Sequence, residues 1–283
     1  MQQEKPSRTG ELTAIMRAIH QIVDDEPRIV VDSIAPRLVD TTGGADDWLA
    51  PILNHPFAKQ WRAGFLIRNR YAEDCLADGV ERGVRQYAIL GAGLDTFAFR
   101  QPPWARPISV YEIDHPATQS LKRDRLAAAG IAIPPNLAFV PVDFERPSLS
   151  DALRGADFDF SKQTFFSWLG VTQYLTLDAI NETLEFVLTL PRSSEIVFSF
   201  ILPFEMSPSL EAEALATVAR KAAEIGEPWL STFRAEDLKI RLRAMGFSEV
   251  IHLTPEDVYE RYLKNRRDGL EARRGEQLIR AVV

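Results

Sequence analysis

Three apolar, strand-like segments each end in glycines or acids, a pattern typical of a nucleotide-cofactor site. The run QYAILGAGLD carries Gly91 and Gly93 one residue apart, followed by Asp95, and the run VYEIDHP ends in Glu112 and Asp114. Glycines let the backbone turn tightly and approach a ligand closely. An acid about 20 residues beyond such a turn is suited to bind ribose hydroxyls. One of the two acids can instead cap the following helix, and both roles stay open.

The third segment, FVPVDFE, ends in Asp143 followed by Phe144. A carboxylate can accept a hydrogen bond from an adenine amino group, and an aromatic side chain can pack on the ring. The dinucleotide fingerprint G-x-G-x-x-G would require a third glycine at position 96, where the chain has Thr96. The missing glycine disfavours an NAD(P)-dependent oxidoreductase, which is the alternative interpretation.

These segments belong to an alternation of strand and helix patterns that begins near residue 84. Strands alternating with helices predict an α/β fold with a mostly parallel sheet and helices on both faces. The apolar, β-rich runs predict strands at 86–90, 108–114, 137–143, 163–169, 195–201 and 248–253. Helices are expected between them at 116–129, 148–154, 177–190, 207–226 and 235–245. The final run EQLIRAVV is expected as a last, antiparallel strand, although a short apolar tail is also compatible with a helix.

The first 80 residues contain no strand pattern and are expected to be mostly helical. Helical spacing of apolar residues predicts one helix from Glu11 to Val23, with Thr9 as its cap, and a second from Phe57 to about Leu76. The predicted organisation is therefore an N-terminal helical cap, residues 1–80, and a cofactor-binding domain, residues 81–283. A cap insertion is expected at about 202–234, where Phe204, Met206 and Trp229 either line an apolar pocket or belong to the core.

Composition excludes several classes of partner. The chain has 283 residues and a formal net charge of −7, without a dense block of Lys and Arg, so nucleic acid is not an expected partner. No run approaches the roughly 20 apolar residues of a membrane helix. The polar N-terminus and the single cysteine, Cys75, favour a cytoplasmic location. No metal site is expected.

Taken in order, the motifs ILGAGLDTFAFR, VYEIDHP, FVPVDFE and SWLGVTQYLT resemble those of S-adenosylmethionine-dependent methyltransferases related to leucine carboxyl methyltransferase. The similarity extends to SRTGELTAIMRA and IRNRYAEDCL ahead of the first strand. The pattern is most similar to a bacterial branch associated with O-methylation of polyketides and other secondary metabolites. The resemblance implies a Rossmann-like class I methyltransferase fold with a seven-stranded sheet, S-adenosylmethionine as cofactor and a small-molecule methyl acceptor.

The resemblance also implies roles for individual residues in binding the cofactor. An arginine just before an aromatic residue is expected to hold its carboxylate, which assigns Arg70 ahead of Tyr71 and leaves Arg68 as a solvated helix position or the alternative. Arg8 is a loose counterpart of a basic residue near the N-terminus of relatives. The other expected cofactor contacts are Gly91, Gly93 and Asp95 at the methionine end, Asp114 with or without Glu112 at the ribose, and Asp143 and Phe144 at the adenine.

The acceptor determines which further residues are needed for catalysis. A carboxylate is ionised at neutral pH and needs no general base, whereas a hydroxyl would benefit from one. His55, in a proline-rich segment, is the candidate base, and Tyr174 either orients the acceptor or only packs. Relatives often carry a glutamate five residues before this tyrosine, where the chain has Leu169. This departure keeps open a third interpretation, a cofactor-binding protein without catalysis.

Overall fold

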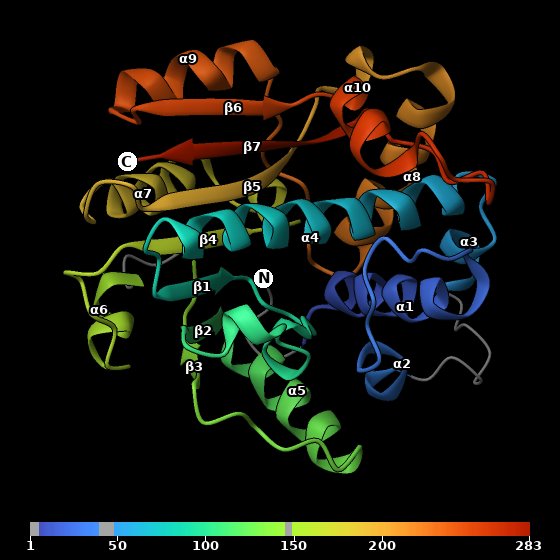
Figure 1. The fold of residues 1–283 in the computed structure, drawn as a ribbon. Coiled ribbons are helices and arrows are strands. Elements are labelled where there is room, and N and C mark those ends of the chain that lie inside the picture. Colours follow the sequence, from blue (N-terminus) through green and yellow to red (C-terminus); the bar gives the residue numbers. More distant parts are fainter. Residues whose placement is uncertain (1–5, 40–47, 145–148) are drawn as a thin grey trace.

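The computed structural model describes residues 6–39, 48–144 and 149–283, which form a seven-stranded sheet with helices on both faces (Figure 1). The strands match the segments expected from the sequence, including the last one. They are β1 (Gln86–Leu90), β2 (Ser109–Asp114), β3 (Leu137–Pro141), β4 (Thr164–Trp168), β5 (Glu195–Ile201), β6 (Glu249–Leu253) and β7 (Glu276–Val282).

The strands lie in the order β3-β2-β1-β4-β5-β7-β6. Neighbouring strands from β3 to β5 pair in parallel, and β7 pairs antiparallel with both β5 and β6. The order reverses between β1 and β4, and in open α/β sheets this switch marks the crevice in which ligands bind. The expected seven-stranded, mostly parallel sheet is confirmed.

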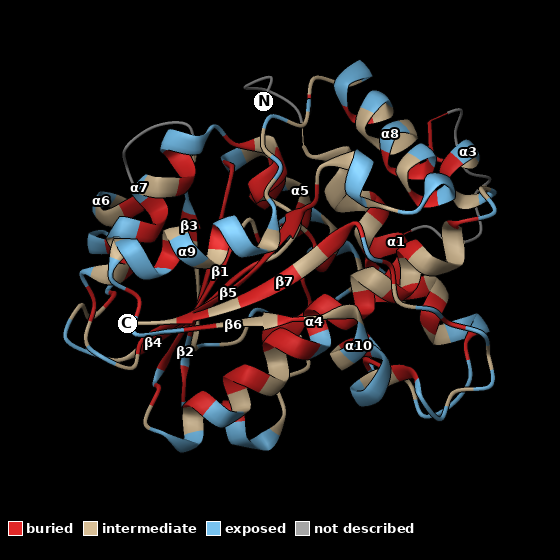
Figure 2. Ribbon diagram, turned by 90° about the horizontal axis from the view of Figure 1, so that it is seen from above, coloured by how far each residue is buried: buried red, intermediate tan, exposed pale blue. Residues whose placement is uncertain are grey.

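Alternate residues of the central strands enter two separate hydrophobic cores. In β1, Ala88 and Leu90 pack with one core, whereas Tyr87 and Ile89 pack with the other. Every residue of β1, β4 and β5 is buried, as Figure 2 shows for the centre of the sheet. Burial on both faces explains why these strands appear in the sequence as continuous apolar runs.

Some of the described helices pack on one face of the sheet, some pack on the other face, and the N-terminal helices pack at its edge. One core includes residues of α6, α7 and α9, and the other includes α4 and α10. The α-helices are α1 (Arg8–Val23), α2 (Ala35–Leu38), α3 (Ala50–Leu53), α4 (Ala58–Glu81), α5 (Pro116–Ala128), α6 (Leu149–Arg154), α7 (Leu177–Leu188), α8 (Ser209–Glu224), α9 (Ala235–Met245) and α10 (Pro255–Val258). Shorter turns are the 3₁₀ helices η1 (Phe97–Phe99), η2 (Pro103–Ala105), η3 (Thr172–Tyr174) and η4 (Phe204–Met206) and the π-helix η5 (Tyr259–Leu263).

The N-terminal helices form a third core that connects them to the sheet. Apolar residues of α1, α3 and the start of α4 pack together with Leu94, from the turn after β1, and Ala214 of α8. The cap of α1 is Ser7, whose hydroxyl accepts a hydrogen bond from Gly10 N, and not Thr9 as expected. The expected helix at 148–154 is present as α6 from Leu149 to Arg154, and residue 148 lies outside the described part of the chain.

Candidate active site

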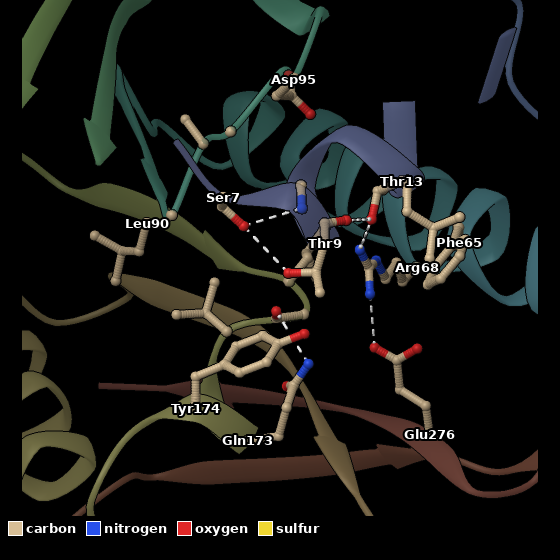
Figure 3. Close-up of a pocket in the computed structure, with 18 of the residues that line it drawn as sticks. Ser7, Thr9, Thr13, Phe65, Arg68, Leu90, Asp95, Gln173, Tyr174 and Glu276 are labelled. Carbon is tan, nitrogen blue, oxygen red and sulfur yellow. Dashed lines mark hydrogen bonds and ion pairs between the residues drawn. The ribbon is translucent and has the colours of Figure 1, made fainter. Parts of the chain in front are cut away.

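A cavity of about 170 Å³ opens at the edge of the sheet where the parallel strands end (Figure 3). Residues after β1, β2, β3 and β4 form its floor, and α1 and α4 form one wall. Leu215 and Val218 of α8, with Trp229 beyond it, form another wall. The cavity therefore lies at the switch in strand order, with α1, α4 and α8 around it.

Asp114 connects the ends of β1 and β2 beneath the cavity. Its carboxylate accepts hydrogen bonds from the backbone N–H groups of Gly93 and His115. Burial raises the pKa of Asp114, while the two amides favour its ionised form. The side chain is thus fixed at the cavity floor, where the sequence predicts contact with the ribose.

The two positions of the turn, Gly91 and Gly93, require glycine for different structural reasons. Both have positive φ, +68° at Gly91 and +50° at Gly93, which favours glycine. A Cβ on Gly91 would collide with the side chain of Val171 in the turn after β4. A Cβ on Gly93 would have as its nearest neighbour the Cα of Gly10, 4.0 Å away. Gly91 therefore brings two strand ends together, and Gly93 leaves space beneath α1.

Asp95 faces the cavity and is held by the elements around it. Its carboxylate accepts hydrogen bonds from Phe97 N at 2.7 Å and Asn69 Nδ2 at 3.2 Å. Arg17 of α1 lies 3.6 Å from the same carboxylate and donates to the carbonyl oxygen of Leu94. The first helix is thereby attached directly to the glycine turn.

Asp143 and Phe144 also line the cavity, at the end nearest β3. The ring of Phe144 lies 6.3 Å from the ring of Trp168, at the end of β4. An acid and an aromatic ring on one wall have the donor–acceptor and packing properties of an adenine site. Their role in binding adenine remains a prediction.

The opposite end of the cavity is basic. Arg68 of α4 donates to Glu276 Oε1 at 2.8 Å and contacts Thr13 of α1 at 3.3 Å (Figure 3). Arg273, in the segment before β7, forms an ion pair with the same glutamate. Burial lowers the pKa of Arg68 to about 10 and that of Arg273 to about 9, so both remain cationic at neutral pH.

The structure places the two arginines of the IRNRY segment differently from expectation. Arg70 is exposed, donates to Asp74 at 2.7 Å and does not line the cavity. Arg68 is 7% exposed and lines the cavity, so the expectation that it is a solvated helix position is wrong. Of the two arginines, the structure places Arg68 and not Arg70 at the cavity, and which of them binds the cofactor carboxylate remains a prediction. The physical reason is helical phase, because two residues turn a side chain by about 200° around the axis.

Two further expected residues lie outside the cavity wall. Glu112 is fully buried against Lys122 of α5, and burial raises its pKa to about 7. It therefore belongs to the α5-facing side of β2 and not to the cavity lining. His55 accepts a hydrogen bond from Phe57 N at 3.0 Å and packs 4.9 Å from Trp61, so it is not placed as a base.

Tyr174 and Leu169 both line the cavity beyond β4. Burial raises the pKa of the Tyr174 phenol, and the carboxylate of Glu227 acts in the same direction. The phenol is therefore neutral near pH 7 and can donate a hydrogen bond. Leu169 contributes an apolar surface, and the next residue, Gly170, has no side chain in the space that Arg68 occupies. Arg8, in contrast, stacks over Trp48 at 5.3 Å and is not in the cavity wall.

Sequence patterns do not single out Arg273 and Glu276, since EARRGEQ looks like a solvated loop. A topological signal for them exists. An antiparallel strand begins at the edge where parallel neighbours end, and Glu276 pairs with Ile201 at the end of β5. An antiparallel β7 therefore places the residues just before it at the same edge of the sheet as the cavity.

The fold and cavity define a Rossmann-like α/β protein with a cofactor crevice at its switch point. Residues 10–188 match the model of the family described as leucine carboxyl methyltransferase. The Bacillus subtilis (strain 168) protein named "Putative S-adenosyl-L-methionine-dependent methyltransferase YktD" is 35% identical over 240 residues, 84% of this chain and 76% of its own. This chain belongs to the leucine carboxyl methyltransferase family.

Two other proteins extend the comparison. A similarly named protein of Mycolicibacterium smegmatis is 30% identical over 223 residues, covering 72% of this chain and 74% of its own. The crystal structure of a DUF574 family protein from Streptomyces avermitilis shares the fold, with a TM-score of 0.60 and 16% identity over 98% of this chain and 97% of its own. The resemblance expected from the motifs is confirmed.

Neither a membrane-spanning helix nor a metal cluster is found among the described residues. Within residues 6–39, 48–144 and 149–283, no helix has the length and apolar character needed to span a bilayer. In the same part of the chain, no group of three or more His, Cys, Asp or Glu side chains is arranged to hold a metal ion.

Proposed function

We propose that the chain transfers a methyl group from S-adenosylmethionine to an oxygen atom, of a carboxylate or a hydroxyl, on a small molecule. Family membership makes the chain a methyltransferase that uses S-adenosylmethionine, as its motifs predict. The observation that carries the proposal is the division of one cavity into an acidic end, with Asp114 and Asp143, and a basic end with Arg68. The −7 charge favours a small acceptor over nucleic acid.

Two cavity residues have buried polar atoms that this cofactor could pair with. Nε of Arg68 and Oε1 of Gln173 are buried without a hydrogen-bond partner in the described structure, and both side chains line the cavity. Buried polar atoms without partners are costly, so a ligand with complementary groups would stabilise them. Arg68 would hold the cofactor carboxylate, Asp114 the ribose, and Asp143 with Phe144 the adenine. We propose that residues 1–80 and the insertion at 202–234 cover this site.

S-adenosylmethionine supplies a methyl group on a sulfonium, already activated for in-line displacement. The remaining task of the protein is to align the acceptor, which intramolecular models value at about 7–11 kcal/mol. Tyr174, kept neutral by its raised pKa, is placed to donate a hydrogen bond to the acceptor. Leu169, Val171 and Ile201 would exclude water around the reacting atoms. A carboxylate acceptor would need no base, because it is already ionised.

Position 96 offers a structural reason to prefer this function over a dinucleotide oxidoreductase. Thr96 is fully buried, and its hydroxyl donates to Asp32 Oδ2 and accepts from Arg100. The side chain fills the position that a third glycine would leave open for close packing beside a pyrophosphate.

The test uses tritiated S-adenosylmethionine and a panel of apolar acids, phenols and alcohols. Transfer of label to an organic product supports methyl transfer, and alkaline treatment then separates the oxygen types. Methyl esters release labelled methanol in alkali, whereas methyl ethers keep the label. Label found only on nitrogen or sulfur acceptors in a wider panel would refute O-methylation.

A further inference from the structure

The basic end of the cavity holds two buried guanidinium groups and one carboxylate. Glu276 pairs with Arg68 through one oxygen and with Arg273 through the other. Both guanidiniums stack on the ring of Phe65, with Cζ at 4.7 Å for Arg68 and 4.8 Å for Arg273. These three side chains, here called the Arg68–Arg273–Glu276 cluster, are buried, and the buried carboxylate of Glu211 on α8 is a second negative charge that acts on Arg273.

Arg273 reaches the cluster because neighbouring positions lack side chains. A Cβ on Gly64 of α4 would collide with the guanidinium of Arg273, as a Cβ on Gly170 would with that of Arg68. On the other side, Glu211 of α8 accepts hydrogen bonds from the backbone of Arg274 at 2.7 Å and Gly275 at 2.6 Å. The segment before β7 is therefore fixed between α4 and α8, and Arg273 has a defined position.

The two arginines differ in what surrounds them. Arg68 contacts Thr13 of α1 and lies against Gly170, next to the β1–β4 switch where the cofactor is expected. Arg273 comes from the β7 edge, near the apolar cavity residues Ile201, Leu215 and Val218. Nε of Arg273 is buried without a hydrogen-bond partner among the described residues, and Arg273 lines the cavity. A buried donor of this kind favours a ligand that accepts hydrogen bonds, and arginine binds carboxylates bidentately.

We propose that Arg273 is a specificity-determining residue that binds a carboxylate of the methyl acceptor, which is an acid with an apolar body. This inference rests on the proposed function, in which Arg68 binds the cofactor carboxylate. Glu276 then positions both guanidiniums and balances one of their charges. The apolar residues of α8 and of the end of β5 contact the body of the acceptor.

The test measures binding to the full-length protein saturated with S-adenosylhomocysteine, so that Arg68 is occupied. The probes are phenylacetate, hexanoate, octanoate and cinnamate, each compared with its neutral amide by calorimetry. We expect at least one acid to bind about tenfold or more tightly than its amide, as expected for a charge-assisted contact. Arg273→Gln should remove this preference, and Arg273→Lys should restore only part of it.

Arg273→Gln is expected to fold, because it leaves Arg68 and Glu276 as a balanced pair. Its affinity for S-adenosylhomocysteine should stay within about twofold of wild type, and this binding also reports that the site is intact. Arg70→Gln, which changes an exposed arginine paired with Asp74, is the matched control and should keep the preference for acids.

The outcomes distinguish a failure of the proposed function from a failure of the role proposed for Arg273. Wild-type protein that does not bind S-adenosylhomocysteine would refute the proposed function itself. Protein that binds the cofactor product but shows no preference for any acid over its amide, including no binding of either, overturns the role of Arg273. An unchanged preference in Arg273→Gln overturns it as well.

Discussion

The hydroxyl of Thr9 donates a 2.7 Å hydrogen bond to Glu227 Oε2, which joins the first turn of α1 to the segment after α8. Both segments contribute residues to the cavity wall. This bond therefore connects α1 with the segment after α8, the two parts that are proposed to cover the site.

Thr9→Val should loosen this cover, because it keeps the shape of the side chain and removes the donor. A hydrogen bond to a charged group such as the Glu227 carboxylate contributes about 1.5–3 kcal/mol, so release of S-adenosylhomocysteine should accelerate by about tenfold or more in stopped-flow displacement. Thr189→Val removes a hydroxyl that donates to Phe186 O on the exposed surface, and it should leave the release rate unchanged. Equal rates in Thr9→Val and wild type would show that the bond does not hold the cover.

Arg68→Gln should weaken binding of S-adenosylhomocysteine by about 10-fold or more, the usual effect of removing a hydrogen bond to a charged group. Methylthioadenosine lacks the amino-acid carboxylate, so its affinity should hardly change. Calorimetry on both ligands separates a direct contact from a general collapse of the pocket. Arg70→Gln is the matched control, and a larger loss there than at Arg68 would show that Arg70 and not Arg68 holds the cofactor carboxylate.

Gly91→Ala should destabilise the fold through both backbone strain and the contact with Val171. Gly130 has a similar φ, +61° against +68°, but a Cβ there would meet nothing within 4 Å. Gly130→Ala therefore measures the strain alone, of order 1 kcal/mol or somewhat more. We expect Gly91→Ala to lose clearly more unfolding free energy in urea, and Val171→Ala to recover part of the difference. Equal losses at the two glycines would mean that the strand ends are not in close contact.

The buried Glu112–Lys122 pair should make stability depend on pH. Burial raises the pKa of Glu112 from 4.5 to about 7, so the folded state binds a proton more tightly than the unfolded state. Its stabilising contribution is then complete below pH 4.5 and is lost as the pH rises to about 7. The loss is on the order of 3 kcal/mol.

The double variant Glu112→Gln, Lys122→Met isolates this effect, since it removes the titrating group without leaving an unpaired buried charge. The unfolding free energy of wild type relative to the variant should fall across this pH range. A difference that stays constant with pH would show that Glu112 does not titrate in the folded state.

The sheet could be predicted from the sequence because burial on both faces leaves a direct trace. Val110 and Ile113 in β2, or the seven buried residues of β5, appear as apolar runs of strand length. The strand-end residues Gly93, Asp114 and Asp143 were found for the same reason, since each immediately follows or ends such a run.

The helical part of the site was harder to predict, because side-chain direction depends on helix phase and on distant partners. Arg68 and Arg70 have the same chemistry and are separated only by Asn69. Of the two, only Arg68 forms an ion pair with Glu276, which lies 208 positions later in the chain. The direction of the Glu112 side chain in β2 was equally hard to predict. Its buried ion pair with Lys122 of α5 keeps it in the core and away from the cavity. Local sequence carries no record of such pairings.

The reversed direction of β7 separates the two halves of the site along the gene as well as in space. The cofactor contacts proposed above come from residues up to 173, whereas the loop that carries Arg273 lies about 100 residues later in the chain and enters the cavity from the opposite side. Exchange of the segment between η5 and β7 could therefore change which acids are accepted without altering how the methyl donor is held. A small C-terminal graft would then be enough to redirect the enzyme to a new acceptor.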